Sequence, residues 1–182
     1  MSKVRYHVAM SLDGYIAGPN GEADWIVMDP DVNFAELWAQ FDTFLMGRRT
    51  YEAASARLGK SSMQGGKVVV VSRTMRSKDH PEVTIISELN RDSIQTLRAQ
   101  SRKDIWLFGG GALFHHLLNL GEIDTVEVSI IPVILGAGIP LLRPPALQTK
   151  LSLTSHKVYR SGRVALAYEV QRANPSNLAV RV

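Results

Sequence analysis

The sequence predicts an α/β protein with a mostly parallel central sheet, flanked by helices and bordered by an antiparallel C-terminal edge hairpin. Three observations support this class. Short apolar runs alternate with segments of helical periodicity through most of the chain. Glycine-containing turns follow several of these runs. The last two runs, 151–159 and 164–171, flank a short turn at Ser161 and Gly162, as in a hairpin.

The expected strands are runs of apolar, often β-branched residues bounded by turn residues. In chain order they are 4–10, 43–46, 67–71, 83–86, 105–108, 125–131, 151–159 and 164–171. A loop rich in Gly, Pro, Asn and Asp, 13–24, follows the first of them. A Gly- and Pro-rich excursion, 132–145, precedes the hairpin. Its apolar side chains are suited either to cover this chain's own sheet edge or to bury against a second subunit.

The expected helices carry apolar residues three and four positions apart. They are 31–42, 48–58, 90–101 and 112–120. In the first of them, Asp31 lies where a helix cap or first-turn carboxylate is favourable. Trp38 and Trp106 fall on inward-facing apolar patterns, so we expect both in the core.

Length and composition indicate one globular domain. The chain has 182 residues, of which 45% are hydrophobic and 21% charged. We expect a single domain at 1–172 and a loosely held tail at 173–182. The absence of cysteine excludes disulfides, thiolate catalysis and cysteine-ligated metals. No apolar run approaches the roughly 20 residues of a membrane span, and the N-terminus lacks a signal-peptide layout. We therefore expect a cytoplasmic protein without a membrane partner.

The charge balance favours small anionic ligands. Lys and Arg number 21 against 17 Asp and Glu, a formal net charge of +4. The basic residues are scattered, whereas nucleic-acid binding is typical of a clustered patch. His115 and His116 point about 100° apart on a helix, so they are poorly placed to chelate a metal together. Neither nucleic acid nor a metal is expected.

Four chemically distinctive segments lie at or just past the ends of expected strands. They are 9–17, 46–52, 71–74 and 104–114. In sheets of this class, ligands collect at the carboxyl ends of the strands. Three of the segments offer donors suited to anions, as a ligand with several phosphates requires. The sequence therefore predicts a polyphosphate site at one edge of the sheet.

The fourth segment is the most informative, because a buried strand runs into three consecutive glycines and then a helix. Gly109, Gly110 and Gly111 let backbone N–H groups approach a ligand, and the helix N-terminus beyond them favours a phosphate. The spacing is neither that of a Rossmann turn nor that of a P-loop. A tight packing turn is the alternative interpretation.

The second and third segments combine free helix or turn N–H groups with a guanidinium and a hydroxyl, all suited to phosphate. The residues are Gly47, Arg48 and Thr50 in one segment and Ser72 and Arg73 in the other. Each side chain also has a structural alternative. Arg48 is then a solvated helix residue, Arg73 a turn residue and Thr50 a local backbone partner.

The four motifs, in this order, resemble the dihydrofolate reductase family. The nearest resemblance is to the branch with the reductase domain of the bifunctional riboflavin-biosynthesis deaminase–reductase. The motifs are Ser-Leu-Asp-Gly-Tyr-Ile-Ala at 11–17, Met-Gly-Arg-Arg-Thr-Tyr-Glu at 46–52, Gly-Gly-Gly at 109–111 and Ile-Pro-Val-Ile-Leu-Gly-Ala-Gly at 131–138. The resemblance covers about residues 3 to 170 and implies a dihydrofolate reductase-like fold.

The resemblance implies an NADPH-dependent reductase of a small heterocycle, pterin-like or aminopyrimidine-like, similar to 5-amino-6-(5-phosphoribosylamino)uracil reductase. It places Ala9 and Ile16 at the nicotinamide. It assigns phosphate contacts to Gly47, Arg48, Thr50, Gly109, Gly110 and Gly111, and the adenosine 2′-phosphate to Ser72 and Arg73. Two guanidiniums match NADPH better than NADH by charge. Relatives are often dimers, so a homodimer is expected.

The resemblance leaves two candidates for the acid that serves the reduced heterocycle. Asp13 corresponds to the carboxylate on the substrate side of the riboflavin branch, and Asp31 lies near the pterin-binding carboxylate of dihydrofolate reductases, with Glu36 one turn further on. The structural alternatives are a turn beside Gly14 for Asp13 and a helix cap for Asp31. True dihydrofolate reductase activity and non-catalytic NADPH binding are the alternative functions.

The chain departs from both relatives. Tyr15 follows Gly14 where the riboflavin branch usually has lysine, so a cationic contact to a sugar phosphate is lost. The surroundings of the pterin in the folate enzymes are not recognisable either. We therefore expect a stand-alone reductase whose heterocycle differs from both known substrates.

Overall fold

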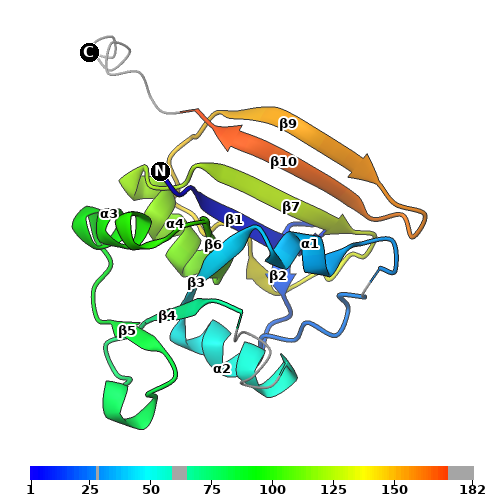
Figure 1. Ribbon diagram of the computed structural model, residues 1–182. Coiled ribbons are helices and arrows are strands. Elements are labelled where there is room, and N and C mark those ends of the chain that lie inside the picture. The colour runs from blue at the N-terminus through cyan, green and yellow to red at the C-terminus, as the bar shows by residue number, and fades with distance from the viewer. Residues whose placement is uncertain (28, 59–64, 172–182) are drawn as a thin grey trace.

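An eight-stranded mixed sheet forms the centre of the protein (Figure 1). The structure, a computed structural model, describes residues 1–27, 29–58 and 65–171. The sheet contains β1 (Val4–Ser11), β3 (Phe41–Gly47), β4 (Lys67–Val71), β5 (Thr84–Ile86), β6 (Asp104–Gly109), β7 (Thr125–Ile131), β9 (Leu151–Val158) and β10 (Val164–Val170). A separate pair is formed by β2 (Tyr15–Ala17) and β8 (Ile139–Pro140). The expected tail at 173–182 lies outside the described residues.

The strand order is β5-β4-β3-β6-β1-β7-β10-β9. The first six of these strands run parallel, and β10 is antiparallel to both β7 and the edge strand β9. This arrangement confirms the predicted parallel sheet with an antiparallel C-terminal edge hairpin. Because sequential parallel strands need a crossover, helices occupy the connections.

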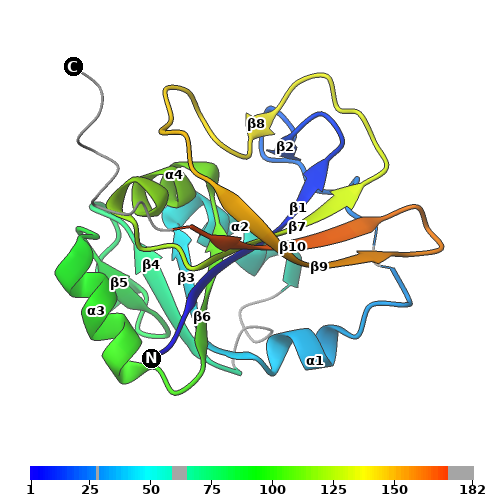
Figure 2. The same cartoon turned by 90° about the horizontal axis from the view of Figure 1, so that it is seen from above.

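The helices cover both faces of the sheet. They are α1 (Phe34–Trp38), α2 (Arg48–Leu58), α3 (Arg91–Gln100) and α4 (Gly111–Leu120), and a 3-10 turn spans Ser77–Asp79. In Figure 2, α4 and α1 lie on opposite sides of the strands. No helix in the part of the chain described here is long and apolar enough to cross a bilayer.

Successive side chains of a strand point to opposite faces of the sheet, so the strands contribute to two hydrophobic layers, one on each face. Tyr6 belongs to the layer under α3 and α4, and its ring stacks on Phe114 at 4.0 Å between centroids. Trp106 belongs to the layer under α1 and α2, and its ring centroid lies 5.1 Å from that of Trp38. The predicted core position of Trp106 is therefore confirmed, whereas Trp38 is partly buried and packs against this core.

The helix expected at 31–42 is much shorter than predicted. It begins after Asn33, whose side chain accepts a hydrogen bond from the Glu36 backbone at 3.1 Å, so Asn33 is the cap and not Asp31. The strand begins at Phe41, which is 2% exposed and packs on Trp106. Burial of Phe41 in the sheet therefore overrides its helical spacing.

The 132–145 excursion folds back on its own chain. β8 pairs with β2, Leu141 donates its backbone N–H to Gly14 at 2.9 Å, and Leu141 and Leu142 pack against the core. Ile134 of this segment is 70% exposed. Figure 2 shows the β2–β8 pair beyond the ends of β1 and β7.

Candidate functional site

The four distinctive segments meet at one edge of the sheet, because they follow the carboxyl ends of parallel strands. Met46 pairs with Gly109, and Gly47 pairs with Val71. At the other side of β6, Ser11 at the end of β1 pairs with Ile131 at the end of β7. Residues as far apart in the chain as Ser11 and Ile131 thus share one edge.

The glycine turn is in contact with the start of α2. Gly109 has φ +144°, the Gly109–Gly110 peptide bond is cis, and Gly110 caps α4 without a side-chain hydrogen bond. A Cβ on Gly110 would lie 3.3 Å from Oγ1 of Thr50, and one on Gly109 would lie 3.4 Å from its Cγ2. The hydroxyl of Thr50 therefore borders the uncapped helix N-terminus, where an anion is favoured.

Gly111 has a packing reason of its own. A Cβ there would lie 2.8 Å from the Pro140 carbonyl oxygen and 3.6 Å from Cδ1 of Ile16. The close approach of β8 therefore requires a glycine at this position. The packing interpretation holds for Gly111, while Gly109 and Gly110 face Thr50.

Replacing Gly111 by alanine is expected to destabilise the protein by about 1–3 kcal/mol, because the methyl group overpacks against backbone atoms of β8. Gly47→Ala is the matched control, since a Cβ on Gly47 meets nothing within 4 Å. Chemical denaturation of both variants measures the difference. Equal stability of the two variants would show that β8 moves aside at little cost.

The basic residues at this edge are exposed. Arg48 forms an ion pair with Glu52 at 3.0 Å, one turn further along α2. Ser72 is buried, and its hydroxyl accepts the backbone N–H groups of Thr74 at 3.2 Å and Met75 at 3.1 Å. Ser72 therefore closes the turn after β4, and the exposed Arg73 is the side chain of this segment that is free to meet a ligand.

The two residues expected at the nicotinamide come from β1 and β2. Ala9 pairs with Ser129 two residues before the end of β1. Ile16 lies beside Gly111. Both are partly exposed, and both lie near the edge that carries the glycine turn. Their contact with a nicotinamide stays a prediction.

Asp13 anchors the loop that follows β7. Its carboxylate accepts the Ser11 hydroxyl at 2.7 Å and the backbone N–H groups of Leu135 at 3.1 Å and Gly136 at 2.7 Å. These hydrogen bonds, that of Ser11 foremost, lower the pKa of Asp13. An ionised, bonded carboxylate organises this loop and is poorly suited to donate a proton. Its contact with a substrate stays a prediction.

A cavity of about 230 Å³ lies between α1 and the sheet. Asp31 and Glu36 line its α1 side, and His7 and Ser129 line it from β1 and β7. Its other lining residues include Asn33, Gln40, Lys157, Tyr159, Arg163 and Ala165. Asp31, just before α1, and Glu36, on α1, therefore border one open cavity, whereas Asp13 lies at the loop beyond β1.

His7 is neutral at physiological pH. Burial lowers its pKa to about 4, the charges of Arg5 and Arg163 also lower it, and the charge of Glu127 opposes them. Arg5 and Glu127 form an ion pair at 2.7 Å. The wall formed by β1 thus presents an uncharged imidazole to the cavity.

The buried imidazole predicts that stability falls with acidification. Between about pH 6.5 and about pH 4 the unfolded chain protonates His7 while the folded protein does not. The free energy of unfolding therefore falls by about 3 kcal/mol as the pH is lowered through this range. Below that range the folded state also binds the proton and the loss levels off. Urea denaturation at a series of pH values measures the slope, and His7→Gln should flatten it. An unchanged slope in the variant would assign the acid sensitivity to other groups.

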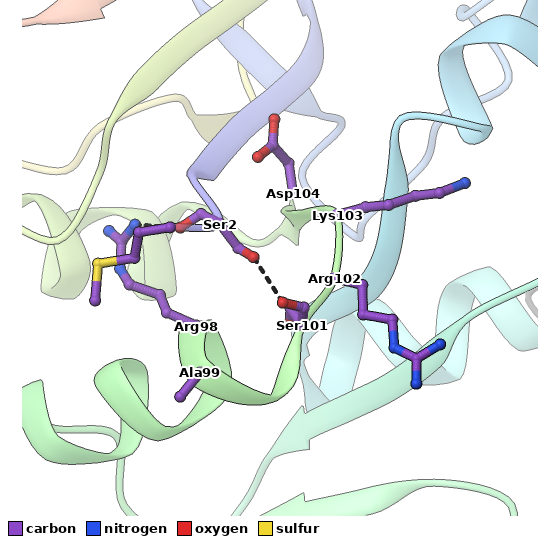
Figure 3. A pocket seen from close by; sticks show the side chains of 8 residues that line it. Ser2, Arg98, Ala99, Ser101, Arg102, Lys103 and Asp104 are labelled. Atoms are coloured by element: carbon purple, nitrogen blue, oxygen red, sulfur yellow. Dashed lines mark hydrogen bonds between the residues drawn. The ribbon is translucent and has the colours of Figure 1, made fainter.

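A second depression, of about 440 Å³, lies at the opposite edge of the sheet (Figure 3). Its lining residues are Met1, Ser2, Arg98, Ala99, Ser101, Arg102, Lys103 and Asp104. Ser2 donates its hydroxyl to the Ser101 carbonyl at 2.9 Å. This depression lies at the amino ends of β1 and β6, away from all four motif segments. It is therefore no part of the candidate site.

Sequence reasoning missed the hairpin side of the cavity. Lys157 comes from β9, and Tyr159 and Arg163 come from the turn between β9 and β10. The sequence shows all three only as ordinary hairpin residues. The paired histidines take no part. The His116 ring lies 2.6 Å from the Leu89 carbonyl, and the described residues contain no group of three or more His, Cys, Asp or Glu placed to hold a metal.

Comparisons with known proteins agree with this geometry. The family model of the RibD C-terminal domain matches residues 2–165. The uncharacterized protein YyaP of Bacillus subtilis (strain 168) is 33% identical over 172 residues, which cover 88% of this chain and 91% of YyaP.

Two solved structures share the fold. One is the diaminohydroxyphosphoribosylaminopyrimidine deaminase/5-amino-6-(5-phosphoribosylamino)uracil reductase of Thermotoga maritima, with a TM-score of 0.72 and 18% identity over 93% of this chain and 57% of that chain. The other is the dihydrofolate reductase of Enterococcus faecalis complexed with NADP(H), with a TM-score of 0.68 and 14% identity over 93% of this chain and 97% of that chain. The fold is therefore dihydrofolate reductase-like, and the chain belongs to the RibD C-terminal domain family.

Proposed function

We propose that this protein is an NADPH-dependent reductase that transfers a hydride to a small heterocycle. The observation that carries the proposal is the meeting of the four motif segments, three of them with donors suited to anions, at the carboxyl edge of the sheet. The family contains reductases, and a protein of the same fold is known in complex with NADP(H). Activity and cofactor are proposals for this chain.

The residues at the edge fit a dinucleotide with several phosphates. The N-terminus of α4 has no side-chain cap and is bordered by the Thr50 hydroxyl. Gly47 leaves open space at the start of α2, and Arg73 is exposed after β4. The α4 N-terminus, Thr50 and Arg48 would hold the pyrophosphate, and Arg73 the 2′-phosphate.

NADPH, when bound, supplies the hydride, so the chain's own task is to position the heterocycle and supply a proton. The cavity beside α1 is the proposed place for the heterocycle, because it is lined by polar groups from α1, the sheet and the hairpin turn. Asp31 or Glu36 would hold amino or ring N–H groups, or serve as the proton source, directly or through water. Asp13 would keep the neighbouring loop in place.

The proposal is tested by fluorescence titration with NADPH and NADH in parallel, followed by NADPH oxidation assays. The substrate panel begins with dihydrofolate and the deaminated aminouracil intermediate of riboflavin synthesis. Tighter binding of NADPH than NADH, with oxidation in the presence of a heterocycle, supports the reductase. Turnover of dihydrofolate would assign dihydrofolate reductase activity. Binding without oxidation would favour a non-catalytic NADPH-binding protein, and no binding of either nucleotide would remove the proposal.

A further inference from the structure

Arg163 is a buried guanidinium without a carboxylate partner. Its residue is 8% exposed, and its Nη2 donates to the Ser129 hydroxyl at 2.6 Å. Its Nε is buried and has no hydrogen-bond partner among the described residues. Within the same residues no carboxylate lies at salt-bridge distance from it. A hydrogen bond from Ser161 foremost, and also the charge of Arg163, lower the pKa of the nearby Asp29. The two carboxylate oxygens of Asp29, however, accept hydrogen bonds from the Ser161 hydroxyl and from the Asp31 backbone N–H.

A second cation lies on the same wall of the cavity. The Lys157 ammonium lies 4.6 Å and the Arg163 guanidinium carbon 5.1 Å from the centre of the Tyr159 ring. All three residues line the cavity of about 230 Å³. The ring attracts both cations, but two like charges held in one place repel each other. Both cations help to lower the pKa of the buried Asp29, so one carboxylate partly offsets them. Within the described part of the chain neither cation forms an ion pair with it, so this wall carries two positive charges without a directly paired carboxylate.

The other deeply buried arginine shows what a structural guanidinium looks like in this protein. Arg98, 5% exposed, contacts Asp124 at 2.6 Å and Glu122 at 3.6 Å. Its Nε, like that of Arg163, is buried without a hydrogen-bond partner among the described residues, so the two arginines differ in their carboxylate partners and not in Nε. Buried charges are normally paired because an unpaired one is costly to desolvate. Arg163 departs from that rule at the wall of a cavity, as groups that await a ligand do.

We propose that Arg163 and Lys157 form an anion subsite, and that the substrate is a small heterocycle bearing a carboxylate on its ring. The anion subsite is argued from these two residues alone; only the statement that its ligand is a substrate rests on the proposed reductase function. The opposite wall carries Asp31 and Glu36, which suit amino and ring N–H donors. Because the two walls border one small cavity of about 230 Å³, we take the acidic group to be attached directly to the ring.

The test is calorimetric titration of the full chain with orotate and with uracil, which share one ring and differ by the carboxylate. Orotate is expected to bind at least about tenfold more tightly, the worth of one charge-assisted hydrogen bond. Arg163→Gln and Lys157→Gln should each reduce this preference. Arg160→Gln, an exposed cation of the same hairpin turn that does not line the cavity, should retain it. Equal affinity for the two probes, or no binding of either, would overturn the proposal.

A stability measurement separates a ligand-binding role from a structural one. Arg163→Met is expected to unfold at the same temperature as the wild type or higher, because it removes an unpaired buried charge. A large fall in its unfolding temperature would make Arg163 a structural residue and overturn the proposal. Should Arg163→Gln fail to fold, the exposed Lys157 carries the test alone.

NADPH titration of the same variants keeps the two proposals apart. If the protein binds orotate more tightly than uracil but does not bind NADPH, the anion subsite is supported and the proposed reductase function is rejected. NADPH binding with equal affinity for orotate and uracil would remove only the subsite. Unchanged NADPH affinity in Arg163→Gln is the expected result, because the subsite lies beside α1 and not at the glycine turn.

Discussion

Replacing Arg98 by methionine is expected to destabilise the protein by about 3–5 kcal/mol, the usual cost of breaking a buried ion pair. Arg98 lies 2.6 Å from Asp124 and 3.6 Å from Glu122, and it also donates to the carbonyls of Ser2 at 2.7 Å and Glu122 at 3.0 Å. The variant leaves both buried carboxylates without that guanidinium. The network joins the N-terminus of β1 to α3 and to the turn before β7.

Urea denaturation monitored by tryptophan fluorescence measures this loss. Arg102→Met is the matched control, because Arg102 is an exposed arginine of the same surface depression. We expect the control to stay within about 0.5 kcal/mol of the wild type. A loss in Arg98→Met of less than about 1 kcal/mol would show that the carboxylates rehydrate or find other partners.

Replacing Arg73 by alanine is expected to weaken NADPH binding by roughly 10- to 100-fold while leaving NADH binding nearly unchanged. A charge-assisted contact to phosphate contributes about 1.5–3 kcal/mol, and NADH has no 2′-phosphate to contact. Arg73 is suited to this role because it is exposed directly after β4, whereas the neighbouring Ser72 hydroxyl is engaged in its own turn.

Parallel fluorescence titrations with the two nucleotides measure the change in preference. Arg76→Ala is the control, since Arg76 is an exposed arginine three residues further along. The control should retain the preference for NADPH. An equal loss of affinity for both nucleotides in Arg73→Ala would show that Arg73 does not bind the 2′-phosphate. A similar loss of NADPH preference in Arg76→Ala would indicate a general electrostatic contribution.

Most strands and three of the four helices were predictable because their signals are local. The β-branched run of β4 and the apolar run of β6 need no distant information. The helix expected at 31–42 is wrong at both ends, for a different physical reason at each. Asn33 competes as a cap at one end, and Phe41 is drawn into the sheet at the other, where burial outweighs helical spacing.

The short pair β2–β8 escaped prediction because neither strand has a periodic pattern of its own. Each is only two or three residues long and lies in a Gly- and Pro-rich segment. Their pairing also explains Gly111, whose missing side chain makes room for Pro140. A glycine that looked like part of a phosphate turn therefore has a packing role that no local signal reveals.

The parallel sheet, the antiparallel hairpin and the four motif segments at the strand ends are readable from the sequence, because each depends on residues close together in the chain. Which side chains face each other across the site is visible only in the folded protein. The fold places Arg163 and Lys157 across one cavity from Asp31, more than 120 residues away, and leaves Arg163 without a carboxylate while pairing Arg98 with two. The physical reason is that charge pairing and burial arise from contacts between distant segments, which local periodicity does not encode.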